Sequence, residues 1–201
     1  MPDERVNPTL FEPEVIRGIT ERLRVTWLLR RFDERKVWAV FMFVNGFVTI
    51  GLLSLVALAT GTPFVFPSLG PTAFLFFFDP RAPSASPHHA VIGHAIGILC
   101  GYGSLLLFHL EHSGSALALG MDGRRVLAAA LSLAATGALM ILLKAAHPPA
   151  GATTLIISLG AIVQPLHLVV IEVALVLLVL QAIVINRLAG LDYPLWRPRA
   201  R

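Results

Sequence analysis

Four long apolar runs constrain this chain more than any other feature of its sequence. They cover 37–60, 89–110, 126–146 and 166–188, and each can cross a hydrocarbon layer of about 30 Å at about 1.5 Å per helical residue. Hydrophobic residues make up 56% of the 201 residues, and charged residues only 14%. A soluble protein of this size exposes too much surface to hide that much apolar material. We therefore expect an all-α integral membrane protein and exclude an ordinary soluble enzyme, a disordered chain and a nucleic-acid-binding module.

The charged residues lie mainly at the two ends of the chain. Residues 1–36 hold eight of the 16 basic and seven of the 12 acidic side chains, and four more arginines follow from residue 187. We predict a charged cytoplasmic segment over 1–36, a transmembrane domain over 37–188 and a basic cytoplasmic tail over 189–201. Basic residues collect on the cytoplasmic side of membranes, so the basic residues at the chain ends, which accompany a net charge of +4, indicate topology. We expect both termini on the cytoplasmic side of a bacterial inner (plasma) membrane.

The charged N-terminal segment contains a stretch, 13–32, that favours an interfacial helix. Its apolar residues Ile16, Ile19, Leu23 and Trp27 fall roughly on one face, with arginines elsewhere. A solvated tail with a short helix is the alternative. The segment could also contact a cytosolic partner, which makes a membrane-anchored sensory or binding module one hypothesis for the whole chain.

Two shorter apolar stretches, 64–78 and 148–163, open with proline and glycine. Proline cannot continue a helix from its N-terminal side, but it is well placed in a first turn, so each stretch should begin as irregular backbone and become a short helix. Irregular backbone at membrane depth must be buried in protein or line a wet cavity. The stretches align at one constant offset, which places Pro67, Gly70 and Thr72 on Pro148, Gly151 and Thr153.

The chain therefore divides into two units of span, broken stretch and span, over 37–110 and 126–188. Corresponding broken segments in two halves point to a transporter's binding site, whereas chance similarity of Gly/Pro-rich segments is the alternative. We favour four transmembrane helices plus two re-entrant half-helix segments, with Arg124 and Arg125 inside. In the competing interpretation, six short spans form a 3+3 inverted repeat and these two arginines move outside.

The start of a helix carries unpaired N–H groups and a partial positive charge, which suit an anion. Glycine lets backbone approach a ligand closely, and hydroxyl groups donate to a small oxyanion. Capping and close packing by small residues is the alternative role for the same side chains. The predicted substrate-binding residues of the two broken stretches are Ser68, Gly70, Thr72, Pro148, Pro149, Gly151, Thr153 and Thr154.

Ionisable residues inside the apolar runs are costly in a membrane and are functional candidates. Lys144 lies three residues before His147, on the same helical face if the helix continues, and the pair could attract an anion. Snorkelling of Lys144 to an interface is the alternative. Glu172 could pair with Lys144, structurally or in a coupling role, and we add His89 and His94 to Glu172 as coupling or gating residues.

No motif in the chain points to catalysis. The histidines lack a Cys or carboxylate at a spacing typical of zinc, and no nucleophile motif, phosphate loop or dinucleotide fingerprint is present. We expect no catalytic residue, metal or cofactor, although a histidine-metal membrane enzyme is a third hypothesis. Because four helices of this length enclose a pore poorly, we expect a homo-oligomer in the lipid bilayer, or two halves that enclose one site.

The run from Lys144 through His147-Pro148-Pro149 to Thr154 resembles the signature of the HPP family of integral membrane proteins, as do 68–73 and 86–94. That family is described with four transmembrane helices, and some plastid and cyanobacterial members are associated with nitrite transport. The resemblance implies a transporter or channel for a small inorganic anion, with nitrite first. Many members read Gln-Pro-Arg-Asn where residues 86–89 read Ser-Pro-His-His, so titratable imidazoles replace a fixed guanidinium.

Overall fold

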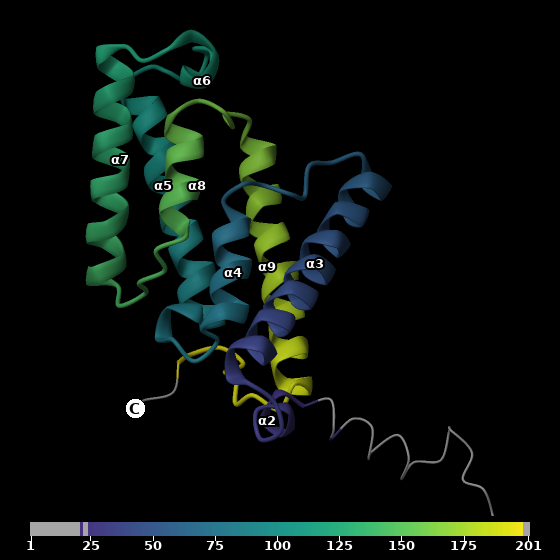
Figure 1. Cartoon of the computed structure of the whole chain (residues 1–201). Coiled ribbons are helices and arrows are strands. Elements are labelled where there is room, and N and C mark those ends of the chain that lie inside the picture. Colours follow the sequence, from purple (N-terminus) through teal and green to yellow (C-terminus); the bar gives the residue numbers. More distant parts are fainter. Residues whose placement is uncertain (1–20, 22–23, 199–201) are drawn as a thin grey trace, which may run out of the picture.

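The computed structural model describes residue 21 and residues 24–198, and every regular element in that part of the chain is a helix (Figure 1). Four helices are long and apolar enough to cross a membrane, which confirms the four predicted spans to within a few residues. They are α3 (Glu34–Thr60), α5 (Pro87–Leu107), α7 (Gly123–Leu142) and α9 (Pro165–Leu188). The two broken stretches form short helices, α4 (Leu69–Phe78) and α8 (Ala150–Ser158).

Three single turns complete the described chain: α2 (Val25–Leu28), η1 (Pro83–Ala85) and α6 (Ala116–Leu119). Half of the interfacial helix predicted over 13–32 lies outside the described residues, and α2 is a helical turn in its described part.

Polar side chains fix where three of the long helices begin. Asp33, Ser86 and Asp122 each accept a hydrogen bond from a backbone N–H three residues further on, and so satisfy one of the unpaired donors of a first turn. Pro87 follows Ser86 in the first turn of α5, where its missing N–H costs nothing.

Hydrogen bonds show which helix ends lie together. At one end, called the terminal end here, α2 bonds to the residue after α9 through Val25–Ala189, and α9 bonds to the end of α4 through Asn186–Phe76. The start of α5 bonds to the C-terminal segment through His88–Trp196, and Val37 at the start of α3 packs with Val25 and Ala189. At the opposite end, called the α6 end, the end of α5 and the start of α7 meet the end of α8, through the pairs Arg125–Ser158, Arg125–Gly114 and Ala116–Leu159.

The two short helices therefore lead the chain from one end of the bundle to the other. After α3 reaches the α6 end, residues 61–68 and α4 bring the chain to the terminal end, where α5 starts (Figure 1). After α7 returns to the terminal end, residues 143–149 and α8 lead back to the α6 end (Figure 1). A re-entrant segment would leave at the end where it entered. The favoured re-entrant course is thus not the one observed, and the order is that of the six-span alternative.

The offset that aligns Thr72 with Thr153 also relates the helix bounds of the two halves. Shifting α4 by this offset gives 150–159, against 150–158 for α8. The same shift moves the ends of α3 and α5 to 141 and 188, against 142 for α7 and 188 for α9. The halves therefore share the order and spacing of their elements, while α4 and α8 run in opposite directions.

A row of glycines brings α5 and α8 into backbone contact. Gly93, Gly97 and Gly101 are buried and recur at every fourth position, so they share one face of α5. A Cβ at Gly97 would lie 2.9 Å from the Ala150 carbonyl oxygen, and one at Gly101 would lie 2.9 Å from that of Thr154. Only glycine allows this close approach, which is the usual way in which membrane helices pack tightly.

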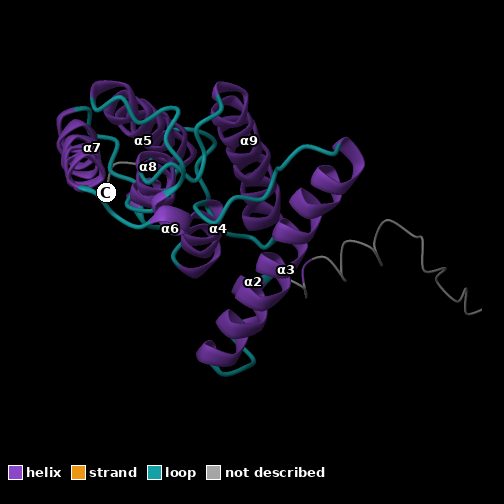
Figure 2. Cartoon of the chain, turned by 90° about the horizontal axis from the view of Figure 1, so that it is seen from above, coloured by secondary structure: helices purple, strands orange, loops and turns teal. Residues whose placement is uncertain are grey.

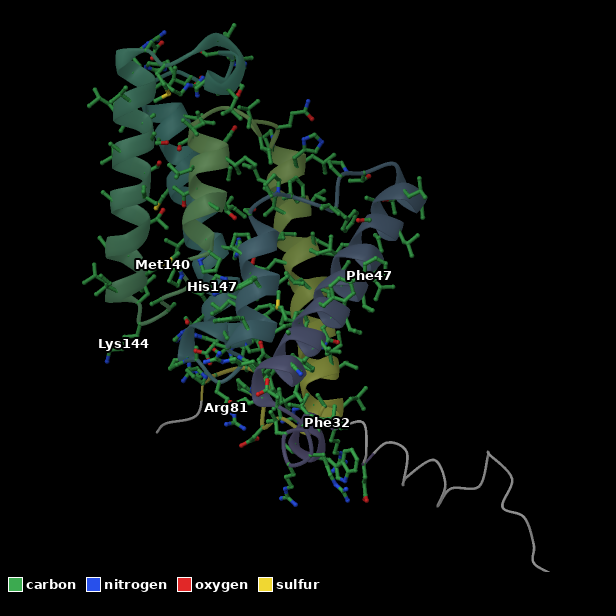
Figure 3. All side chains as sticks on the ribbon, in the orientation of Figure 1. Phe32, Phe47, Arg81, Met140, Lys144 and His147 are labelled. Carbon is green, nitrogen blue, oxygen red and sulfur yellow. The ribbon has the colours of Figure 1, made fainter. Side chains whose placement is uncertain are left out.

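Helices α7 and α9 pack against α5, whereas α3 packs against α4 and α9. Seen from above, α5, α7 and α8 gather at one side of the molecule and α3 lies at the other (Figure 2). The most apolar window of α3 is only 11% buried, and the side chain of Phe47 is 75% exposed. Figure 3 shows Phe47 projecting outward. Such a face suits lipid, and the expected homo-oligomer stays a prediction.

Candidate functional site

A buried chain of hydrogen bonds lies where α4, α5 and α8 meet. His94 of α5 places its Nε2 atom 2.9 Å from the Thr72 hydroxyl and its Nδ1 atom 2.8 Å from the Thr153 hydroxyl. All three side chains are fully buried. Thr72 and Thr153 are matched by the offset between the two halves, so one imidazole joins equivalent residues of the repeat.

His147 extends the chain toward the terminal end. Its Nε2 atom lies 3.2 Å from the Thr72 hydroxyl, and its Nδ1 atom lies 2.7 Å from the carbonyl oxygen of Ser84, beside η1. The rings of His94 and His147 are 5.2 Å apart between centroids, and both are fully buried. We call the group Thr153, His94, Thr72, His147 and the Ser84 carbonyl the central chain.

Thr154 belongs to a separate contact. Its hydroxyl lies 2.9 Å from that of Thr136 on α7 and 3.2 Å from the Ala150 carbonyl oxygen. The Thr136 hydroxyl donates to the Ser132 carbonyl oxygen at 2.8 Å. Thr154 therefore joins α8 to α7, on a side of α8 different from that of Thr153.

The start of α8 offers few backbone donors to an anion. Pro148 and Pro149 carry no N–H, and the N–H of Ala150 donates to the His147 carbonyl oxygen. The N–H of Gly151 donates likewise to the Pro148 carbonyl oxygen. The groups expected to bind an anion at this helix end are thus missing or already bonded. Gly151 instead gives packing room, because a Cβ there would lie 3.3 Å from Leu133.

The start of α4 is equally poor in backbone donors, because the Leu69 N–H donates to the Phe66 carbonyl oxygen and Pro71 has no N–H, but it differs in one side chain. The Ser68 side chain is almost completely buried, with only 1% of the residue's surface exposed, and its hydroxyl has no hydrogen-bond partner within the described residues. Ser68 stands one helical turn before Thr72, so the two hydroxyls lie on the same face of α4. Gly70 is exposed and has no heavy atom within 4 Å of its would-be Cβ position. Of the two short helices, α4 therefore has the unsatisfied polar end.

All residues of the central chain lie within the range matched by a known protein family. A family model described as "HPP, transmembrane region" matches residues 33–194, from the start of α3 to beyond α9. The chain belongs to the HPP family. No curated protein and no solved structure matches the chain significantly.

The residues His147-Pro148-Pro149 of the HPP signature have two structural roles in this chain. His147 is a member of the central chain, while Pro148 and Pro149 start α8 without N–H groups that would need partners. Pro148 is exposed and Pro149 is half-buried.

Lys144 of the HPP protein lies outside the span predicted for it. Helix α7 ends at Leu142, and Lys144 follows in a left-handed conformation with φ of 52°. The N–H groups of Lys144 and Ala145 donate to the carbonyl oxygens of Ile141 and Met140, the pattern of a Schellman helix end. The Lys144 side chain is exposed and points away from His147 (Figure 3). It does not share a helical face with His147 because the helix has already ended.

The predicted partnership of Glu172 is also not formed. Both of its carboxylate oxygens are buried and lack a hydrogen-bond partner in the described part of the chain, whereas Lys144 is exposed. His89 is half-buried in the first turn of α5, with its ring 5.5 Å from that of His88. The structure thus unites His94 with the two aligned threonines and His147, and leaves Lys144, Glu172 and His89 outside the central chain.

Several residues that matter structurally carry no functional prediction from the sequence. The glycine row of α5 was readable from its regular spacing. The sequence gives Arg125 only a role in topology, but this residue is only 3% exposed and donates to the carbonyl oxygens of Ser158 and Gly114. The Ser84 carbonyl has no sequence signal, because any residue supplies one.

The last feature to consider is a metal site, which needs several His, Cys, Asp or Glu side chains close together. Among residues 21 and 24–198, no group of three or more His, Cys, Asp or Glu side chains is arranged to hold a metal ion.

Proposed function

We propose that this HPP protein carries a small inorganic anion across the membrane, as a channel or a carrier, with nitrite as the first candidate. The observation that supports the proposal most is the meeting of α4 and α8 at His94 through Thr72 and Thr153. In many secondary transporters, substrate binds near the membrane midplane where broken helices of two repeats meet. Family membership, and the association of some members with nitrite, give the substrate class.

The proposed topology has six crossings. Each short helix is only about 15 Å long, about half the hydrocarbon thickness, and its connecting segment completes the crossing. The halves then have three crossings each in opposite orientations, which is an inverted repeat. The terminal end, with the basic segments of the chain, would face the cytoplasm, while Arg124 and Arg125 would lie on the far side.

We place the anion at the start of α4. The Ser68 hydroxyl is buried without a partner among the described residues, and a helix N-terminus adds a partial positive charge that favours an anion. An unbonded buried hydroxyl costs about 1–3 kcal/mol, and an oxyanion that accepts its hydrogen bond would remove that cost. Thr72, one turn further along the same face, connects this position to the central chain.

Uptake into proteoliposomes tests the proposal. Purified protein should take up nitrite, nitrate, formate or chloride faster than empty liposomes do. Ser68→Ala should lower that flux severalfold, whereas Ser54→Ala is a matched control, because the exposed Ser54 hydroxyl already donates to the Ile50 carbonyl oxygen. Lys144→Ala should change the flux little, since this side chain lies outside the central chain.

The uptake results test the transport function and the anion site at the start of α4 separately. No flux of any of the four anions by the wild-type protein would refute transport. Wild-type flux with full activity of Ser68→Ala would instead remove the anion from the start of α4. The sensory alternative depends on the charged segment 1–36, of which residues 1–20, 22 and 23 lie outside the described residues.

A further inference from the structure

The direction of every hydrogen bond in the central chain follows from one fixed point. A carbonyl oxygen only accepts, so the His147 Nδ1 atom must carry the proton in its 2.7 Å bond to Ser84. In the neutral ring the Nε2 atom then lacks a proton and accepts from the Thr72 hydroxyl. Because Thr72 has one proton, its oxygen must accept from the His94 Nε2–H.

The other side of His94 completes the series. With its proton on Nε2, neutral His94 accepts at Nδ1 from the Thr153 hydroxyl at 2.8 Å. Every link therefore points the same way: Thr153 to His94 to Thr72 to His147 to the Ser84 carbonyl. The two rings must hold opposite tautomers, His94 with its proton on Nε2 and His147 with its proton on Nδ1.

We propose that the central chain is a proton relay, which moves protons from the meeting point of α4 and α8 toward the terminal end and couples them to the anion. The inference rests on the proposed function, because it names the coupling ion of the same site. Side chains in the relay alternate imidazole and hydroxyl, the two neutral groups that can both accept and donate a proton. All four are fully buried, so bulk water does not bypass them.

The transfer step needs two co-reactants, a hydronium ion at the Thr153 hydroxyl and a water molecule at the His147 Nδ1 atom. Because both side chains are fully buried here, the step belongs to an opened state of the protein that admits them. Thr153 takes one proton and passes its own to His94 Nδ1, and His94 passes its Nε2 proton to the Thr72 oxygen. Thr72 passes its own proton to His147 Nε2, and His147 releases its Nδ1 proton to water beside Ser84. One N–H or O–H bond forms for each that breaks, and both rings end neutral.

The relay has a preferred resting arrangement. After a transfer, the bare Nδ1 atom of His147 faces the Ser84 carbonyl oxygen, so two acceptors oppose each other. Losing that hydrogen bond disfavours the reversed chain. The starting tautomers return when each imidazole gives its newly gained proton to water and takes one from water on its other nitrogen, while the hydroxyls rotate back. The reset chain is again ready to accept a proton at Thr153 and to release one beside Ser84.

Few other ionisable groups border the relay. The residues of α4 and α8 include none, and the arginines of α7 lie in its first turn, at the α6 end. α5 contributes His88 and His89, whose rings are 5.5 Å apart between centroids. The C-terminal segment contributes Tyr193, whose ring packs on Phe76 beside His147, and α9 carries His167, Glu172 and Arg187.

The test compares uptake with and without a pH gradient. Proteoliposomes with the membrane potential clamped at zero receive nitrite or nitrate under equal pH and under a gradient of one unit, acid outside. Accumulation is scored with nitrate, because nitrous acid diffuses through lipid and brings nitrite to the same ratio in empty liposomes. One-to-one coupling predicts that the gradient drives about tenfold accumulation, because one pH unit is a tenfold proton gradient.

Three threonine variants assign the effect to the relay. Thr72→Val removes the central hydroxyl while keeping the shape of the side chain, and should abolish the response to the gradient. Thr72→Ser keeps a hydroxyl and should retain it. Thr136→Val removes a buried hydroxyl on α7 that is outside the relay, and should also retain the response.

Different results would contradict anion transport and the proton relay. Absence of any anion uptake by the wild type would refute the proposed function itself. Uptake that ignores the gradient, or a full response in Thr72→Val, would overturn the relay and leave anion transport standing. Should Thr72→Val fail to fold, ¹⁵N NMR of histidine-labelled wild-type protein decides, since the relay predicts an Nε2–H tautomer for His94 and an Nδ1–H tautomer for His147. The same tautomer in both rings would overturn it.

Discussion

Replacement of Gly97 by alanine should loosen the contact between α5 and α8. The added Cβ would lie 2.9 Å from the Ala150 carbonyl oxygen and 2.9 Å from the Thr154 hydroxyl oxygen. Ordinary contact begins at 3.4 Å, so α8 must move by a few tenths of an ångström. The backbone carbonyl cannot turn aside as the tip of a flexible side chain could, and the strain therefore spreads to the whole helix.

The expected cost can be separated from helix propensity by a matched control. Overpacking of a tight core costs about 1–3 kcal/mol, while glycine to alanine within a helix gains about 0.8–1 kcal/mol. Gly103 lies on the same helix, is exposed and has no heavy atom within 4 Å of its would-be Cβ. Gly103→Ala gains the propensity without the clash, so the two variants should differ by about 1–3 kcal/mol.

Thermal unfolding in one detergent measures this difference. A difference of about 2 kcal/mol corresponds to about 4–8 °C in Tm for a chain of this size, with Gly97→Ala the lower. Monodisperse elution of both variants at low temperature is the necessary control for folding. Equal Tm values for the two variants would refute the conclusion that Gly97 is required for backbone contact.

Three further variants test other contacts. Arg125→Met should lower the free energy of unfolding by about 2–4 kcal/mol, because two buried charge-assisted hydrogen bonds are lost, while Arg124→Met, at an exposed neighbour, should change it by less than about 0.5 kcal/mol in the same denaturation assay. Thr136→Val should cost about 0.5–1.5 kcal/mol, since Thr154 keeps its bond to α8, and a null effect in thermal unfolding would contradict this. Burial raises the pKa of the Tyr193 hydroxyl, so the unfolded state ionises first as pH rises and stability should fall above about pH 10, by up to about 1.4 kcal/mol per unit. Tyr193→Phe should flatten that fall in a Tm-against-pH series, and an unchanged slope would exclude Tyr193 as its source.

The long helices were predictable because hydropathy and length govern them, and because residues such as Ser86 and Asp122 mark their starts. The end of α7 was not predictable in this way. Apolar residues continue past Leu142, so hydropathy gives no sign that the helix stops there. The stop depends on Lys144 adopting a left-handed conformation, which the presence of a lysine does not signal.

The re-entrant interpretation failed for a related reason. Helices of nine and ten residues are too short to cross a bilayer, so length alone favoured a segment that returns to its side of entry. The connections 61–68 and 143–149 supply the missing distance, and hydropathy does not report the direction in which irregular backbone runs. Contacts such as Asn186 to Phe76 settle that direction for α4, and they join residues 110 apart in the sequence.

The alignment of Thr72 with Thr153 identified the central pair, yet it could not name what joins them. His94 lies 22 residues from Thr72 and 59 from Thr153, and its position depends on α5 packing against α8 through the glycine row. The repeat and the glycine spacing are thus two parts of one arrangement. The repeat supplies two equivalent hydroxyls, on helices α4 and α8 that run in opposite directions. The glycines bring α8 close enough to α5 for the imidazole of His94 to bond both hydroxyls.

The same geometry explains why the two halves are not interchangeable. Pro148 and Pro149 remove backbone donors from the start of α8, whereas Ser68 leaves a buried hydroxyl unbonded at the start of α4. His147 precedes α8, while the aligned position in the first half is Phe66. An anion held at α4 would lie in the first half of the repeat, whereas the proton path joins Thr153 and His147 of the second half to Thr72 and His94 of the first. The two can therefore be coupled where the path enters the first half, at His94 and Thr72.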